Sequence, residues 1–98
     1  MNEVDFTNWL INKGIKKKNI GDFIYRLKRV ERELGNCDLD EHYHNDKCSF
    51  LLATFANMGL NNNMKQFPLA QLPIGKYYMN TYRYSLKKYI KFKEETSS

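Results

Sequence analysis

The chain has 98 residues, of which 42% are hydrophobic and 14% aromatic, and its formal net charge at pH 7 is +5. This length allows one hydrophobic core, and the apolar content excludes a wholly disordered chain. The longest apolar runs span only a few residues, too short for a membrane-spanning helix, and the acidic start does not resemble a secretion signal. We expect a cytoplasmic protein with one helical domain over residues 1–93, followed by a disordered tail or the start of a linker over 94–98.

The first predicted helix covers Glu3–Lys13. Phe6, Trp9 and Leu10 follow one another at intervals of three and one, which places them on one face of a helix. Acidic residues near its start and a lysine at its end suit the helix dipole. Gly14 directly after it is typical of a C-terminal cap.

The second predicted helix covers Asn19–Leu34, with Asn19 as its N-terminal cap and Gly35 closing it. Apolar residues recur along it at intervals of three and four, which predicts one continuous buried face. These residues are Ile20, Phe23, Leu27, Val30 and Leu34.

An acidic connection, Asn36–Asn45, follows, in which Leu39 and Tyr43 would make one short helical turn. The third predicted helix begins at Asn45 or Asp46 and ends at Met58. Its buried face would hold Cys48, Leu51, Leu52, Phe55 and Met58, and Gly59 would cap it.

A long loop, Leu60–Gly75, contains both prolines of the chain and precedes the fourth predicted helix, Lys76–Lys93. We expect the loop to cover the core through Phe67, Leu69, Leu72 and Ile74. The inward face of the last helix would hold Met79, Tyr82, Leu86, Tyr89 and Ile90. No segment shows the alternation of a strand, so the predicted fold class is all-α.

The charges are unevenly distributed along the chain. Lys13–Arg32 holds eight basic and two acidic residues, Glu33–Asp46 holds five acidic and no basic ones, and Arg83–Lys93 holds five basic and no acidic ones. Two basic segments around an acidic one indicate a polyanionic partner, or a protein with an acidic surface. The alternative, that these side chains only solvate the outer faces of helices, stays open.

Binding to duplex DNA is the function that this pattern favours. Lysines just before the second helix would meet phosphates together with the positive end of its dipole, and basic residues with an interleaved tyrosine would do so on the last helix. The candidate nucleic-acid-binding residues are Lys16, Lys17, Lys18, Arg26, Lys28, Arg29, Arg32, Arg83, Tyr84, Lys87, Lys88 and Lys91. Tyr77 and Tyr78 would either stack in the same way or belong to the core.

Two cysteines and both histidines lie within twelve residues, and the spacing of Cys37, His42, His44 and Cys48 matches none of the common zinc fingers. We therefore expect no metal, and we expect free thiols because nothing in the sequence points to secretion. The same residues do not form a recognisable nucleophile and base, and the five glycines are too widely spaced for a phosphate-binding loop. The sequence predicts no enzyme and no cofactor.

Several positions resemble the core-binding domain that precedes the catalytic domain of phage-type integrases, the tyrosine recombinases. They are Phe6-x-x-Trp9-Leu10-x-x-x-Gly14, then Ile20-x-x-Phe23-x-x-x-Leu27-x-x-Val30, and Tyr82-Arg83-x-x-Leu86-x-x-Tyr89-x-x-Phe92. Small helical domains fused to restriction and other defence nucleases are similar. The likeness spans most of the chain outside the acidic connection and the loop.

The resemblance implies a SAM-like orthogonal bundle of four helices, with the proline-containing loop before the last one, that forms half of a clamp around duplex DNA. It implies DNA contacts by Lys16, Lys17 and Lys18 and by basic residues of the last helix. The family commonly has Ser-x-x-Thr where this chain has Lys16-Lys17-Lys18-Asn19. A cap is kept there, but the contact chemistry changes, which puts base-specific recognition in doubt.

Three hypotheses follow. The first is a non-catalytic, DNA-binding helical module. The second is a protein of a phage or mobile element that inhibits or regulates a nucleic-acid enzyme, such as a defence nuclease, with the acidic Glu33–Asp46 segment occupying a basic channel. The third is a domain of a larger enzyme.

Overall fold

The computed structural model describes residues 1–96, which form helices and no strand. The predicted all-α class is therefore confirmed. The helices are α1 (Glu3–Asn12), α2 (Lys17–Glu33), α3 (Leu39–Asp46), α4 (Ser49–Thr54), the short 3-10 helices η1 (Ala56–Gly59) and η2 (Met64–Gln66), and α5 (Met79–Thr96).

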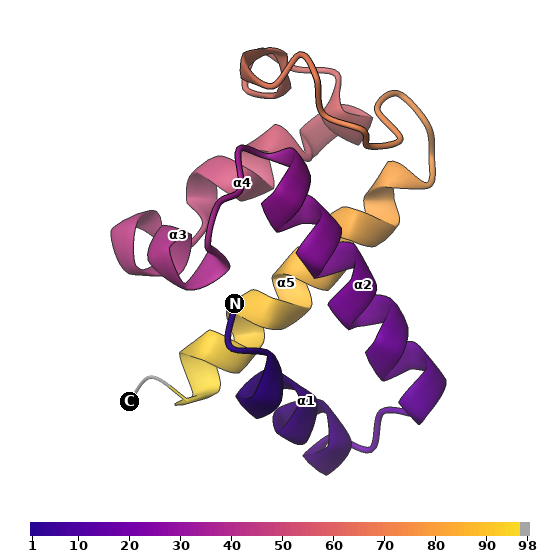
Figure 1. Ribbon diagram of the computed structural model, residues 1–98, viewed down its shortest axis with the longest axis vertical. Helices are drawn as coiled ribbons and strands as arrows, with labels where there is room; N and C mark the ends of the chain where they lie inside the picture. The colour runs from indigo at the N-terminus through magenta and orange to yellow at the C-terminus, as the bar shows by residue number, and fades with distance from the viewer. Residues whose placement is uncertain (97–98) are drawn as a thin grey trace.

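Helix α5 lies at the centre of the molecule. Helices α1 and α2 pack on one side of it, with α2 crossing its middle, and α4 and η1 contact it from another side (Figure 1). The inward residues predicted for this helix are all buried, as are those of the first two helices. The local spacing of apolar residues thus identified the faces that meet in the core.

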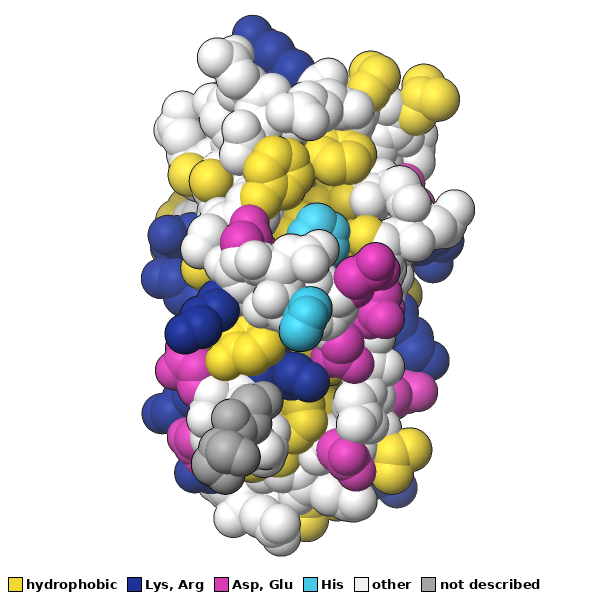
Figure 2. Space-filling view, turned by 90° about the vertical axis from the view of Figure 1, so that its left-hand side faces the viewer, with side chains coloured by type: hydrophobic (Ala, Val, Ile, Leu, Met, Phe, Trp, Pro, Cys, Tyr) yellow, Lys and Arg dark blue, Asp and Glu magenta, His cyan; other side chains and the backbone are white. Residues whose placement is uncertain are grey.

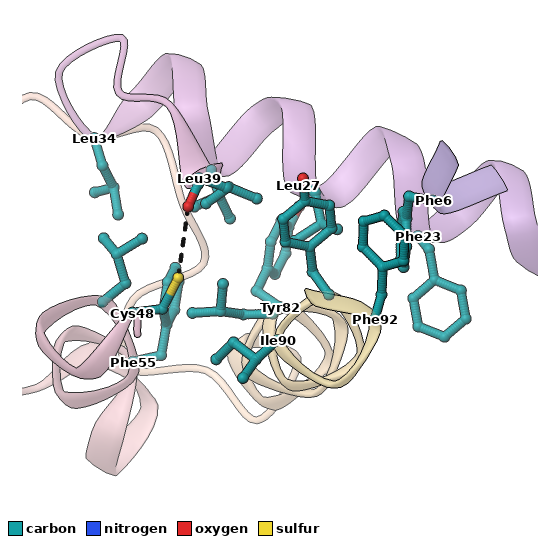
Figure 3. Packing of buried hydrophobic residues seen from close by; sticks show 14 of the residues in the cluster. Phe6, Phe23, Leu27, Leu34, Leu39, Cys48, Phe55, Tyr82, Ile90 and Phe92 are labelled. Carbon is teal, nitrogen blue, oxygen red and sulfur yellow. Dashed lines mark hydrogen bonds between the residues drawn. The ribbon is translucent and has the colours of Figure 1, made fainter. Parts of the chain in front are cut away.

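The core is rich in aromatic rings where α1 meets α5. The ring of Phe6 lies 5.0 Å from that of Tyr89 and 5.4 Å from that of Phe92, and the ring of Trp9 lies 5.8 Å from Phe92. These distances, between ring centroids, are typical of favourable aromatic pairs. Figure 3 shows Phe6, Phe23 and Phe92 beside α5, with Leu27 and Tyr82 farther along the same layer.

The cap predicted after the first helix is confirmed. Gly14 has a φ of 79°, which its missing Cβ permits. The amide of Ile15 donates a hydrogen bond to the carbonyl of Leu10 (3.1 Å), and the amide of Gly14 donates one to Ile11 (3.0 Å). This pattern is a Schellman motif, which ends α1 and turns the chain towards α2.

The prediction of one third helix from Asn45 or Asp46 to Met58 is wrong. The acidic connection forms α3, and α4 begins after a turn at Lys47 and Cys48, whose φ angles are 56° and 63°. This turn buries both Leu39 and Cys48, and the Cys48 thiol donates a weak hydrogen bond to the Leu39 carbonyl at 3.7 Å (Figure 3). Helix α4 ends early, before a second left-handed turn in η1.

The loop before α5 covers the core as predicted at Phe67, Leu72 and Ile74, but not at Leu69, which is 87% exposed. The last helix begins at Met79, three residues later than predicted. Tyr77, outside the helix, is exposed and takes no part in the core.

The last helix also continues beyond Lys93, through residues that were predicted as a tail. Its Glu95 carboxylate accepts a hydrogen bond from the Trp9 indole at 3.1 Å and pairs with Lys13 at 2.8 Å. The contact with Lys13 and then that with Trp9 lower the pKa of Glu95. The predicted tail is thus helical up to Thr96 and contacts α1 through Glu95, and its rest, 97–98, lies outside the described residues.

The ammonium group of Met1 joins α2 to the start of α3. It lies 2.8 Å from a Glu31 carboxylate oxygen and 2.7 Å from one of Asp38. Burial alone would lower the pKa of this ammonium, but hydrogen bonds to Asp38 and Glu31 outweigh it and raise the pKa. The same contact lowers the pKa of Asp38. Glu31 also accepts a hydrogen bond from the Leu39 amide at 3.0 Å, so one carboxylate orients three segments.

Candidate nucleic-acid interface

The second helix begins two residues earlier than predicted. Lys16 is the cap residue, with an extended backbone and no capping hydrogen bond from its side chain, and Asn19 lies within the first turn. The prediction of Asn19 as cap is therefore wrong. This first turn holds no acidic residue, and Lys16, Lys17 and Lys18 are exposed. No acidic side chain therefore neutralises the positive end of the α2 dipole from within that turn.

A second group of cations lies on the outer face of α5. Tyr84, Lys87, Lys88 and Lys91 follow one another at intervals of three, one and three, so they share one side of the helix. Tyr84 is 57% exposed, Lys87 and Lys91 are exposed, and Lys88 is half-buried. Arg83 lies on the flank of this stripe, and its Nε atom is buried without a partner among residues 1–96.

One aromatic contact joins the two helices that carry these groups. The rings of Phe23 on α2 and Tyr84 on α5 lie 5.8 Å apart, at an angle of 35°. Beside them is a pocket of about 260 Å³. Its lining residues are Ile15, Asn19, Asp22, Phe23, Arg26 and Tyr84.

Both basic segments contribute residues to this pocket, and some of their lysines are near neighbours of lining residues along the chain without lining the pocket themselves. Lys16 directly follows the lining residue Ile15, and Lys88 lies one helical turn beyond Tyr84. Within the described part of the chain, no ion pair within 4.0 Å engages Lys16, Lys17, Lys18, Arg26, Lys87, Lys88 or Lys91. These seven cations are available to an external anion.

Three other predicted contact residues of α2 are engaged within the protein. Lys28 pairs with Glu3 at 2.9 Å, and Arg32 pairs with its neighbour Glu33 at 3.1 Å. Arg29 donates hydrogen bonds to the hydroxyl of Tyr82, at 2.9 Å, and to the carbonyl of Gln71. Arg29 therefore joins α2 to α5 and to the loop before it, and the prediction that it faces a ligand is not supported by its contacts.

Most of the acidic segment is also engaged internally. Asp38 binds the Met1 ammonium, and Asp40 accepts a hydrogen bond from the Tyr89 hydroxyl and pairs with Lys93 at 3.3 Å. Asp46 accepts a hydrogen bond from the Phe50 amide at 3.0 Å. The face of the molecule that carries α3 presents acidic side chains and both histidines side by side with apolar ones (Figure 2). Among the acidic residues of α3, only Glu41 has neither an ion pair nor a side-chain hydrogen bond within residues 1–96.

The two cysteines are reduced and lie in apolar surroundings. Burial raises the pKa of the Cys37 thiol to about 11 and that of the Cys48 thiol to about 12. Over residues 1–96, no group of three or more histidine, cysteine or acidic side chains is arranged to hold a metal ion. Thiols with such high pKa values are weak nucleophiles at neutral pH.

Within the same residues, none of the helices combines the length and the apolar content that crossing a membrane requires. Comparisons of the chain with protein-family models, with curated proteins and with solved structures find no match.

Proposed function

We propose that this chain is a non-catalytic module that binds the phosphate backbone of duplex DNA through one surface, the basic interface. This surface consists of Lys16, Lys17, Lys18, Arg26, Tyr84, Lys87, Lys88 and Lys91. The observation that supports it is that two basic segments, far apart in sequence, both contribute residues to one pocket, and that seven of their cations form no ion pair within residues 1–96. A duplex offers closely spaced phosphates to such a surface.

The first turn of α2 strengthens this proposal. Its backbone amides lack helical partners and point out of the helix end, where a phosphate oxygen accepts hydrogen bonds readily. Three lysines surround this end of the helix and no acid lies within its first turn. A cation cluster and a helix terminus thus act on one anion together.

The resemblance to the core-binding domain of tyrosine recombinases supports the same function, because it involves α1, α2 and α5, the helices that carry or support the basic interface. A SAM-like arrangement, with α3 and α4 in place of one continuous helix, is part of this proposal. The proposal also places the protein in the cytoplasm, where DNA is accessible.

The experiment is a binding titration, by fluorescence anisotropy, of a labelled 20-base-pair duplex at several salt concentrations. We expect the affinity to fall steeply as salt rises, with a logarithmic slope of about −0.9 for each phosphate that the protein neutralises. Replacing Lys16, Lys17 and Lys18 together by Glu should abolish binding while circular dichroism shows an unchanged helix content.

The matched control replaces Lys47, Lys65 and Lys76 by Glu, which changes the net charge equally. These three lysines are exposed, form no ion pair within residues 1–96 and lie outside the basic interface. The control should retain most of the affinity. Binding that ignores salt, or that is lost equally in both variants, would contradict the proposal.

The alternative of a protein that regulates a nucleic-acid enzyme through its acidic segment has less support, because Asp38, Asp40 and Asp46 are engaged internally. A nuclease-type partner retained from nuclease-treated extract, and released by Glu41→Lys, would favour this alternative.

A further inference from the structure

The pocket between α2 and α5 contains an acidic residue, which a surface for phosphates alone does not require. Asp22 lines it together with Asn19 and Arg26, and the rings of Phe23 and Tyr84 form its aromatic part. A phosphate would meet repulsion from the Asp22 carboxylate at this point. The pocket therefore differs in chemistry from the lysines around it.

The polar groups of the pocket are unengaged. No side-chain hydrogen bond or ion pair occupies Asn19, Asp22 or Arg26 within the described residues. Asn19 and Asp22 are exposed and Arg26 is half-buried, so all three can reach a ligand in the pocket. They offer an amide, a carboxylate and a guanidinium next to an aromatic ring.

The size of the pocket limits what it can hold. Its volume of about 260 Å³ is below the range of about 300–1,000 Å³ for pockets of drug-sized ligands. A single flat ring system is of suitable size. Tyr84 is 57% exposed, so it has ring surface free for stacking in addition to its contact with Phe23.

We infer that this pocket receives one unpaired nucleobase that carries an amino group, while the surrounding lysines hold the phosphates on either side. The base would stack on Tyr84 and donate from its amino group to Asp22, the pairing that carboxylates make with cytosine N4. Guanine, whose N1–H and N2–H₂ donors are adjacent, offers the carboxylate two hydrogen bonds. Thymine has no amino group and offers the Asp22 carboxylate only its single N3–H donor.

This inference rests on the proposed function and specifies its substrate as DNA with an unpaired nucleotide, such as a bulge or a junction. In a fully paired duplex every base is stacked and its pairing edge is occupied, so the pocket would stay empty. Extruding a base that is already unpaired costs least, which favours such sites.

The test compares an intact 20-base-pair duplex with the same duplex carrying one bulged guanine or one bulged thymine. The wild type should bind the guanine bulge roughly tenfold more tightly than the intact duplex, since stacking of one base on an aromatic side chain contributes about 1–3 kcal/mol. The thymine bulge should gain less. The quantity measured is the ratio of the affinity for a bulged duplex to the affinity for the intact duplex. Electrostatic effects that change the affinity for every duplex equally cancel in this ratio.

The variants assign the gain to the pocket. Tyr84→Ala should remove the gain in affinity for the guanine bulge over the intact duplex, whereas Tyr84→Phe, which keeps the ring, should retain this gain. Asp22→Asn should reduce the preference for guanine over thymine. Tyr25→Ala is the matched control, because Tyr25 is a 61% exposed tyrosine of α2 that does not line the pocket.

The outcomes separate the two proposals. Salt-dependent binding of the intact duplex with no gain from any bulge would overturn the pocket inference alone, as would a gain that survives Tyr84→Ala. Absence of binding to every DNA would overturn the proposed function and this inference together.

Discussion

The guanidinium of Arg29, on α2, donates a 2.9 Å hydrogen bond to the hydroxyl of Tyr82, on α5, and its Cζ atom lies 5.9 Å from the centre of the Tyr82 ring. Tyr82 is fully buried, so its hydroxyl has no access to water. A second bond from Arg29 reaches the Gln71 carbonyl in the loop before α5. Arg29, which the sequence predicts as a DNA contact, thus connects three parts of the fold.

Replacing Arg29 by Ala should therefore lower the free energy of unfolding by about 2 kcal/mol, because a hydrogen bond from a charged group is lost and a buried hydroxyl is left without its donor. Chemical denaturation measures this. Arg32→Ala is the control, since Arg32 is 61% exposed and pairs only with adjacent Glu33, and it should cost less than about 1 kcal/mol. Equal losses in the two variants would contradict a structural role for Arg29.

The contacts of Met1 predict a pH dependence of stability. The pKa of its ammonium is raised above 8.0, so the stabilisation is complete below pH 8 and is lost as the pH rises through the raised value. The pKa of Asp38 is lowered, so its contribution is present above 3.8 and is lost as the pH falls through the lowered value.

Glu31→Gln should therefore reduce the free energy of unfolding by about 1–2 kcal/mol at pH 7, and this difference from the wild type should shrink above pH 9. Urea titrations at several pH values measure it. Glu41→Gln removes the same charge from an exposed side chain that forms no ion pair within residues 1–96, and should change little. A difference that is constant between pH 7 and pH 11 would argue against the ammonium contact.

The turn between α3 and α4 is held in a conformation that disfavours its residues. Lys47 is exposed and has a φ of 56° at the C-terminal cap of α3, a position where glycine fits without steric cost. Lys47→Gly should therefore raise the free energy of unfolding by about 0.5–1 kcal/mol. Lys65→Gly, at an exposed position of η2 without a positive φ, should lower it or leave it unchanged. Thermal denaturation compares the two.

The cysteines should react slowly in the folded protein. With pKa values of about 11 and 12, Cys37 and Cys48 form little thiolate at pH 8, and Cys48 is also fully buried. Iodoacetamide at pH 8, followed by mass spectrometry, should modify Cys37 slowly and Cys48 more slowly still, whereas both should react quickly in guanidinium chloride. Alkylation of the folded protein at the rate of a free thiol would contradict the burial.

The sequence by itself determined α1, α2 and most of α5, because an amphipathic face repeats every three to four residues and is visible locally. The caps at Gly14 and Gly35 were also visible locally, because glycine favours the positive φ that both residues adopt. The buried faces of these helices and the two basic segments can both be identified from residues that lie close together in the chain.

Only the tertiary structure decided where the third helix breaks and which cations are free. The turn at Lys47 and Cys48 contains no glycine, so no local signal marks it, and it forms where burial of Leu39 and Cys48 requires a change of direction. Likewise, Lys28 and Arg29 differ from Arg26 only through partners distant in sequence, Glu3 for Lys28 and Tyr82 for Arg29. Charge is a property of the residue, but its availability depends on what the fold places beside it.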